Sequence, residues 1–134
     1  MLDLKKLLTK ILQKLKAHDV DYITGEAAYE GGTGNTSWRY RKWASGRIEA
    51  WAEVSLGNNT GTVWTSPIYY VEKTITFPSG LFSSAPSNIF LSGGGSQWIP
   101  VGAWGITATG FTCRFIKPSS SAQNLWVRVY AIKY

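Results

Sequence analysis

The first 18 residues alternate leucine and isoleucine with lysine in the pattern of an amphipathic helix. This segment, MLDLKKLLTKILQKLKAH, has no Gly or Pro, and its apolar residues recur about every 3.5 residues, as in a coiled coil. With Met1 at heptad position a, one seam carries Leu4, Leu8, Ile11 and Leu15. Leu7 and Leu12 widen this seam, which favours three or more helices. The pattern predicts a helix over residues 1–18 that forms a short, parallel, trimeric coiled coil.

An apolar face this wide must be covered, because a helix of about 17 residues is barely stable by itself in water. Besides the same helix of other subunits, the possible covers are the protein's own β domain and a lipid surface. Lysine on one face and leucine on the other is also typical of a helix that lies on a membrane. The segment lacks the interfacial tryptophan of such helices, so we do not expect a membrane partner.

From Trp38 to Tyr134 the pattern changes to short β-prone runs separated by Gly, Pro, Asn and Ser. The runs are SWRYRKW, RIEAWAEVS, TVWTS, IYYVEKTITF, SNIFLSG, WIPVGAWGITATG, FTCRFIKP and NLWVRVYAIKY. The first two flank a turn at residues 44–46 and are expected to pair as a hairpin. In the second run, Ala50, Ala52 and Val54 share the face that we expect to meet the core. The number and spacing of the runs predict an all-β head, an antiparallel β-sandwich.

Residues 19–37, DVDYITGEAAYEGGTGNTS, contain four glycines and few strong strand signals. We interpret them as a Gly-rich linker with one short strand around residues 21–24. The predicted organisation is therefore a trimerisation helix at 1–18, a linker at 19–37 and a β head at 38–134.

The positive charge is concentrated in the helix. The chain has 134 residues, a length typical of one domain, and a formal net charge of +6. Residues 1–18 hold five lysines against one aspartate, whereas the remainder is close to neutral. Cations and aromatics interleave in SWRYRKW, but strand alternation divides them into two small, mixed sets on opposite faces, so we do not expect nucleic acid as a partner. We also expect no transmembrane span and no signal peptide, because no apolar run approaches about 18 residues.

The chain is poor in catalytic and metal-binding residues. Its single histidine, His18, ends the helix, and its single cysteine, Cys113, is expected in the core between two phenylalanines. Glu49 and Glu53 would lie about 13 Å apart along a strand, too far for a glycosidase pair unless Glu72 joins them. We therefore predict no enzyme activity, no cofactor and no metal site, although three copies of His18 on a threefold axis would offer one position for an ion.

The sequence resembles a known group of proteins. The run WTSPIYYVEKTITFPSGLFSSAPSNIFLS, followed by GITATGFTCRFIKP and NLWVRVYAIKY, resembles the C-terminal head domain of bacteriophage and prophage tail fibres. YRKWASGRIEAW looks like a hairpin that recurs in such proteins. The resemblance implies a lectin-like β-sandwich related to H-type lectins, a homotrimer, a place at the tip of a phage or prophage-encoded tail, and attachment to a host-surface glycan or cell-wall polymer. Without a long shaft, the chain is expected to be a fibre fragment or a small separate tail protein.

Candidate binding residues follow from sugar chemistry, which needs an exposed aromatic face beside hydrogen-bonding side chains. We predict a carbohydrate site among Gln97, Trp98 and Trp104, or among Asn58, Asn59, Trp64 and Tyr69. Arg114 and Arg128 lie inside strands, where a charge must be exposed or paired, and we expect them to line a groove between subunits. The competing interpretation is that these tryptophans fill the core or a trimer interface, as we expect for Trp51 and Trp126.

The sequence therefore predicts a homotrimeric, non-catalytic, receptor-binding tail protein. Two alternatives stay open: a structural tail component that binds another tail protein, and a membrane-active protein that uses its basic helix.

Overall fold

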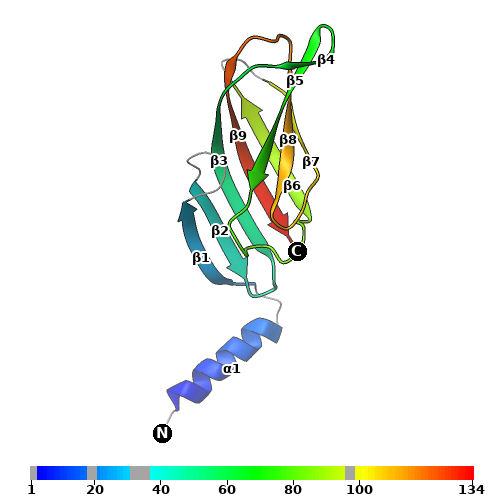
Figure 1. The fold of residues 1–134 in the computed structure, drawn as a ribbon. Helices are drawn as coiled ribbons and strands as arrows, with labels where there is room; N and C mark the ends of the chain where they lie inside the picture. The colour runs from blue at the N-terminus through cyan, green and yellow to red at the C-terminus, as the bar shows by residue number, and fades with distance from the viewer. Residues whose placement is uncertain (1–2, 18–20, 31–36, 96–98) are drawn as a thin grey trace.

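The computed structural model describes residues 3–17, 21–30, 37–95 and 99–134, and within them it has one helix and nine strands (Figure 1). The elements are α1 (Leu4–Ala17), β1 (Ile23–Glu30), β2 (Ser37–Trp43), β3 (Ile48–Asn59), β4 (Thr62–Thr65), β5 (Ile68–Thr76), β6 (Asn88–Gly94), β7 (Val101–Trp104), β8 (Gly110–Lys117) and β9 (Gln123–Lys133). All strand pairs are antiparallel. The all-β prediction with a short N-terminal helix is confirmed.

Helix α1 begins at an aspartate cap. The Asp3 carboxylate accepts hydrogen bonds from the backbone N–H groups of Lys5 and Lys6, at 3.0 and 3.2 Å, which satisfies donors that the first turn leaves free. The helix lies apart from the sheets in Figure 1, and its apolar seam is open: Leu4 is 67% and Leu8 59% exposed. The helix is too short and too polar to cross a membrane. The coiled coil stays a prediction, and His18 lies outside the described residues.

Strand β1 occupies part of the expected linker. It pairs with β2 from Ile23 opposite Trp43 to Glu30 opposite Ser37, so the short strand expected around residues 21–24 is wrong in its extent. The Asp21 carboxylate fixes the start of β1, because it accepts hydrogen bonds from the Ser45 N–H at 3.0 Å and from its hydroxyl at 2.7 Å. The sequence GEAA has weak strand propensity, and pairing with β2 overrides it.

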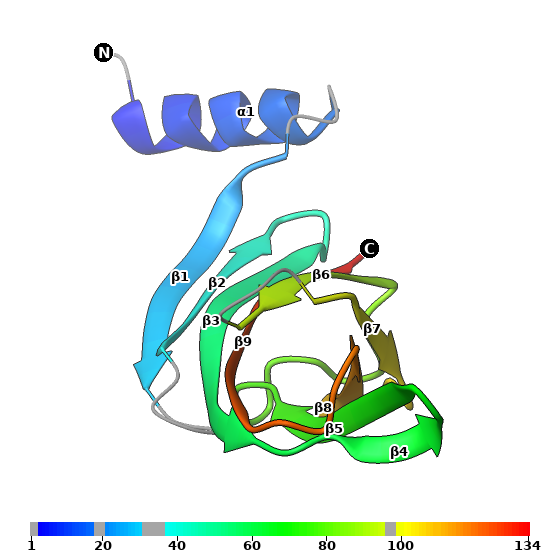
Figure 2. The same cartoon turned by 90° about the horizontal axis from the view of Figure 1, so that it is seen from above.

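The strands form two sheets that share one core. The five-stranded sheet has the order β1-β2-β3-β9-β6 and the four-stranded sheet the order β4-β5-β8-β7. Seen from above, the two sheets curve around a common interior (Figure 2). The expected hairpin is confirmed as β2 and β3, with Trp38 opposite Ala52. Ala50 and Val54 are buried as predicted. A lectin-like sandwich stays a prediction.

Aromatic rings fill one part of this core. Phe77 lies at the centre, with its ring 5.6 Å from that of Trp38, 4.9 Å from Phe82 and 5.7 Å from Phe111. Cys113 is fully buried, as predicted, and burial raises the pKa of its thiol to about 11. These side chains bind the two sheets together, since Trp38 belongs to one sheet and Phe111 to the other.

A buried lysine closes one end of the domain. The Lys117 ammonium donates hydrogen bonds to the carbonyl oxygens of Asn59, at 3.1 Å, and Ser121, at 2.5 Å. Burial lowers the pKa of this amine. The contact joins the ends of β3 and β8 to the turn that precedes β9.

Glu49 is the centre of a polar cluster on the outer face of the five-stranded sheet. Its carboxylate accepts hydrogen bonds from the Trp43 indole N–H and the Tyr130 hydroxyl, each at 2.5 Å. Burial raises the pKa of Glu49, but these two hydrogen bonds stabilise the charged form more, so the net pKa is lowered. Burial and the bond to Glu49 raise the pKa of Tyr130 to about 12.

Replacing Phe77 tests the aromatic core. Phe77→Ala should lower the free energy of unfolding by about 3–5 kcal/mol, because it leaves a cavity among three rings. Phe90→Ala is the matched control, since Phe90 is 59% exposed, and it should lower stability by no more than about 1.5 kcal/mol through loss of its ring contact with Tyr130. Urea unfolding followed by circular dichroism measures both, and equal losses would contradict this account of the core.

The Glu49 cluster predicts a pH dependence of stability. Because the folded pKa of Glu49 is lowered, its contribution is present above the usual glutamate value of 4.5 and is lost as the pH falls through the folded pKa. Tyr130→Phe removes one hydrogen bond to the Glu49 carboxylate, so the variant should lose less stability than the unmodified chain as the pH falls. In the unmodified chain, the raised pKa of Tyr130 should make stability fall between about pH 10 and 12, and Tyr130→Phe should not show this fall.

Urea unfolding at a series of pH values measures both effects. Tyr69→Phe is the control, because Tyr69 lies on the four-stranded sheet, away from this cluster, and its pH profile should match that of the unmodified chain. Identical profiles for Tyr130→Phe and the unmodified chain would contradict the role of this cluster.

Candidate binding site on the four-stranded sheet

The outer face of the four-stranded sheet carries a cleft of about 420 Å³, which we call the Trp64–Trp104 cleft. Its lining residues are Trp64, Gly102, Ala103, Trp104, Arg114 and Ile116. Trp64 comes from the edge strand β4 and Trp104 from the opposite edge strand β7, while β8 supplies Arg114 between them. The indoles are 58% and 52% exposed, so neither ring is part of the core of this chain.

Arg114 organises the aromatic rings of the cleft. Its guanidinium carbon lies 5.4 Å from the ring centre of Trp64, 5.2 Å from that of Tyr70 and 5.9 Å from that of Trp104. Cations at these distances from an aromatic face are attracted to it. One guanidinium therefore holds rings from three strands around a single position.

The charge of Arg114 is balanced within the cleft. The Arg114 Nε donates a hydrogen bond to Glu72 Oε1 at 2.7 Å, and a second guanidinium nitrogen bonds the same oxygen. Glu72 lies directly opposite Arg114 in the pairing of β5 with β8. The cleft thus presents aromatic faces and guanidinium donors, and the Glu72 carboxylate beside its lining balances the charge of Arg114.

Gly102 keeps the floor of the cleft open. It lies opposite Arg114 in the pairing of β7 with β8, and a Cβ atom built on it would meet no atom within 4 Å. The fold therefore has room for a side chain at this position. A larger residue would occupy space that a ligand could otherwise use.

The structure brings together three of the residues singled out in the sequence: Trp64, Trp104 and Arg114. Tyr69 is not with them, because it lies on the same face of β5 as the buried Val71, two residues further on, and is opposite Lys117. Its neighbour Tyr70 reaches Arg114 instead. The period-2 pattern of IYYVEKTITF contains the signal for this assignment, since Val71 and Ile75 point inward.

The predicted asparagines do not line the cleft. Asn59 is buried, and its side-chain amide donates hydrogen bonds to the carbonyl oxygens of Leu56, at 2.8 Å, and Gly57, at 2.9 Å. Asn58 is exposed and lies on the five-stranded sheet, opposite Asn124, and so away from the cleft. The predicted pair Gln97 and Trp98 lies outside the described residues.

Arg128 belongs to a different surface from Arg114. It lies on β9 in the five-stranded sheet, donates a hydrogen bond to Glu53 at 2.8 Å and lies 5.1 Å from the ring centre of Trp126. Within one chain the two arginines do not share a groove. A groove between subunits stays a prediction.

The carboxylates considered for hydrolysis are held separately. Glu49 bonds Tyr130 and Trp43, Glu53 bonds Arg128, and Glu72 bonds Arg114 on the other sheet. They therefore do not form the paired arrangement of a glycosidase. No group of three or more His, Cys, Asp or Glu side chains suited to a metal ion occurs among the residues that the structure describes.

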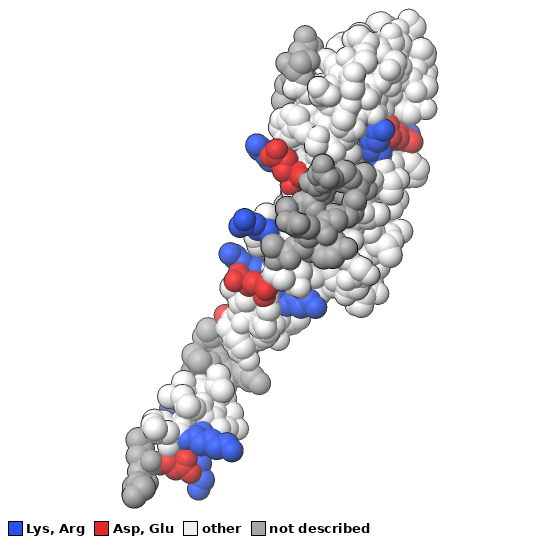
Figure 3. All heavy atoms as spheres, turned by 60° about the vertical axis from the view of Figure 1, so that its left-hand side comes forward, with Lys and Arg blue, Asp and Glu red and all other residues white. Residues whose placement is uncertain are grey.

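Positive and negative side chains alternate on the β domain. In Figure 3, Lys and Arg lie close to Asp and Glu over much of the face shown. The β domain contains three arginine–glutamate ion pairs: Arg41–Glu26, Arg114–Glu72 and Arg128–Glu53. Nucleic-acid binding relies on accumulated positive charge that neutralises phosphates. The paired charges of this face do not provide such a surface.

Comparisons with known proteins identify the fold. No protein-family model matches the chain, and no curated protein matches it. A solved structure of a C-terminal fragment of the R1 pyocin fibre of P. aeruginosa is similar, with a TM-score of 0.56 and 22% identity over 83% of this chain. The chain spans 28% of the length of that structure. A structure of an N-truncated R1-type pyocin tail fibre has a TM-score of 0.58 and 20% identity, covering 92% of this chain and 95% of that one. The chain therefore has a fold found in pyocin tail fibres.

Proposed function

We propose that this chain is a head of a phage-type tail fibre and that it attaches, without catalysis, to carbohydrate on a host surface through the Trp64–Trp104 cleft. The observation that carries the proposal is the pair of exposed indoles held on either side of Arg114. The fold shared with pyocin tail fibres supports a place in a phage or prophage-encoded tail, next to other tail proteins.

The chemistry of the cleft suits a sugar. A pyranose ring has apolar C–H faces that pack on an indole, and its hydroxyl groups exchange hydrogen bonds with polar side chains. Arg114 supplies donors in the cleft, and the Glu72 carboxylate that it binds offers acceptors next to the lining residues. Because these two charges are paired, we infer that the cleft takes an uncharged sugar unit of a surface glycan or cell-wall polymer.

Helix α1 supports a homotrimer. Ile11 is 45% exposed and Leu12 51% exposed, in addition to the open Leu4 and Leu8, so the β domain of the same chain does not cover the seam. Burial of such side chains contributes about 1.5–3 kcal/mol each. We infer that two further copies of the helix cover this face and hold three heads together.

Substitutions in the cleft test the attachment function. Trp104→Ala should lower the affinity for the recognised glycan at least about tenfold, because tryptophans at the centre of a contact contribute strongly to binding. Gly102→Val should reduce binding to a similar degree by filling the floor, and it leaves both indoles in place. Binding is measured by screening the full chain on an array of bacterial surface glycans and titrating the recognised sugars.

Phe90→Ala is the matched control for these variants, since it removes an exposed aromatic ring from the other sheet. It should bind the glycan like the unmodified chain. Binding unchanged in both Trp104→Ala and Gly102→Val would reject the cleft. Binding only to other tail proteins, with no glycan recognised, would favour the structural alternative.

A mass measurement tests the trimer. Sedimentation equilibrium of the full chain should give the mass of three chains, and Ile11→Asp should shift the protein toward monomer, because it places a charge in the apolar seam.

Gln13→Asp is the matched control, since it introduces the same charge at an exposed position outside the seam, and it should leave the mass unchanged. A monomeric unmodified chain would contradict the coiled coil. Binding of that monomer to lipid vesicles would then favour the membrane-active alternative.

A further inference from the structure

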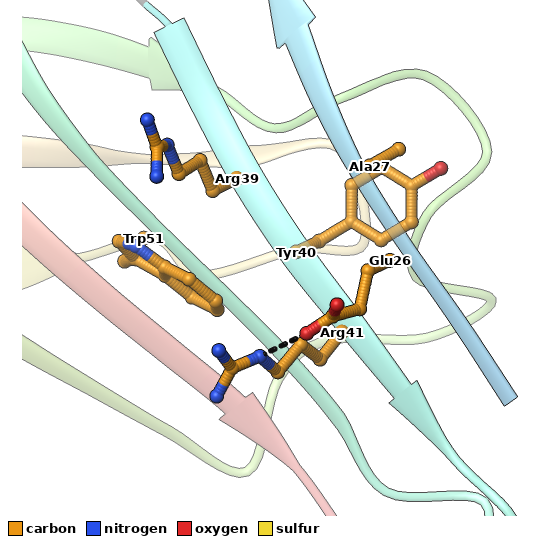
Figure 4. A pocket seen from close by; sticks show the side chains of 6 residues that line it. All are labelled: Glu26, Ala27, Arg39, Tyr40, Arg41 and Trp51. Atoms are coloured by element: carbon orange, nitrogen blue, oxygen red, sulfur yellow. Dashed lines mark hydrogen bonds and ion pairs between the residues drawn. The ribbon is translucent and has the colours of Figure 1, made fainter. Parts of the chain in front are cut away.

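A second open groove crosses the outer face of the five-stranded sheet, and we call it the Arg39–Trp51 groove. One part, of about 280 Å³, is lined by Glu26, Ala27, Arg39, Tyr40, Arg41 and Trp51 (Figure 4). A second part, of about 420 Å³, shares Arg39 and Trp51 and continues to Glu53 and Arg128. Each part has a volume near the lower end of the range of about 300–1,000 Å³ that ligand sites occupy.

The groove carries one unpaired positive charge. Arg41 forms an ion pair with Glu26 at 2.5 Å, and Arg128 forms one with Glu53 at 2.8 Å. Arg39 is exposed between them and makes no ion pair or hydrogen bond through its side chain within the described part of the chain. Figure 4 shows its guanidinium apart from the Arg41–Glu26 contact.

An aromatic ring lies beside this free guanidinium. Trp51 is directly opposite Arg39 in the pairing of β2 with β3, and it is half-buried. Its indole lies between Arg39 and Arg41 in Figure 4, and the Arg41 guanidinium carbon is 5.3 Å from its ring centre. The stacked, ion-paired Arg41 fixes one side of the ring, while Arg39 remains free to bind.

We propose that the Arg39–Trp51 groove binds an acidic sugar, one that carries a carboxylate or a phosphate. The planar guanidinium of Arg39 matches both anions with two parallel hydrogen bonds. Trp51 packs against the C–H face of the same sugar ring. A long polyanion fits poorly, because the carboxylates of Glu26 and Glu53 flank the free charge. The groove therefore differs in specificity from the charge-balanced Trp64–Trp104 cleft and does not depend on it.

Nuclear magnetic resonance of the full chain tests the proposal. The probes are glucuronic acid, glucose 1-phosphate, glucose and inorganic phosphate, each titrated separately into protein labelled with nitrogen-15. Glucuronic acid, glucose 1-phosphate or both should shift the signals of the Trp51 indole N–H and the Arg39 Nε–H. The two acidic sugars distinguish a carboxylate source from a phosphate source. Glucose should bind at least about tenfold more weakly, because it cannot pair with Arg39.

Two substitutions at Arg39 separate charge from geometry. Arg39→Gln should weaken binding of the acidic sugar about tenfold or more, and Arg39→Lys should restore only part of it, because an ammonium lacks the planar fork. Lys42→Gln is the matched control: it removes the same charge from the same strand, but alternation points its side chain to the opposite face from Arg39. Its affinity should equal that of the unmodified chain.

Several results would overturn the proposal. The first is the absence of shifts at Trp51 and Arg39 with either acidic sugar, as expected if a second copy of the chain covers this face. The second is an equal loss of affinity for the acidic sugar in Lys42→Gln and Arg39→Gln, which would indicate that binding depends only on the net charge of the protein. The third is inorganic phosphate binding as tightly as glucose 1-phosphate, which would remove the role of Trp51. Loss of acidic-sugar binding in Trp64→Ala would show that the two surfaces are not independent.

Discussion

The pairing of β3 with β9 is the constraint on which the rest of the structure depends. It runs from Ile48 opposite Lys133 to Asn59 opposite Gln123 and joins the first half of the β domain to the last strand. A shift of one residue in this register would move every side chain to the other face. The observed register sends Ala50, Val54 and Val127 into the core. It also places the end of β3 where the Asn59 carbonyl meets the buried ammonium of Lys117, so one pairing organises both the interior and an end of the domain.

The same alternation that fills the core creates two outward faces of different electrostatic character. On the four-stranded sheet, Arg114 is paired with Glu72 and its guanidinium is shared among three aromatic rings. On the five-stranded sheet, arginines and carboxylates also pair across strands, but Arg39 has no such partner among the described residues. An exposed ion pair contributes little to stability, typically about 0–1 kcal/mol, so the arrangement of these charges is free to serve recognition rather than folding.

Local patterns in the sequence predict the strands better than the sites. Alternation in RIEAWAEVS and NLWVRVYAIKY identifies the buried faces of β3 and β9, because burial of one face imposes a period of two. The extent of strand β1 cannot be predicted in this way, because GEAA has little strand propensity and the Asp21 contact with Ser45 depends on a distant turn. The cleft is harder to predict from the sequence, because only the sheet order makes its residues neighbours. They come from four different strands: Trp64, Tyr70, Trp104 and Arg114. Asn59 shows the opposite error: its position near a turn suggests a binding residue, but its side chain is bound to the backbone of the same turn.

The shape of the two surfaces links the proposed sites to the helix. Both are open, shallow features of a sheet face, and an open site removes only part of a sugar from water, so one copy gains little free energy beyond the cost of association. Linking copies makes each later binding event intramolecular, and avidity then exceeds single-site affinity by roughly 10²–10⁴ when the geometry allows simultaneous contact. The exposed Leu4, Leu8 and Ile11 seam adds nothing to the core of its own domain, and in the proposed trimer this seam would join the copies. In the proposed trimer, weak single sites and a strong contact between helices would therefore combine: one head would bind and release reversibly, and three heads bound together would attach firmly to a repeating surface polymer.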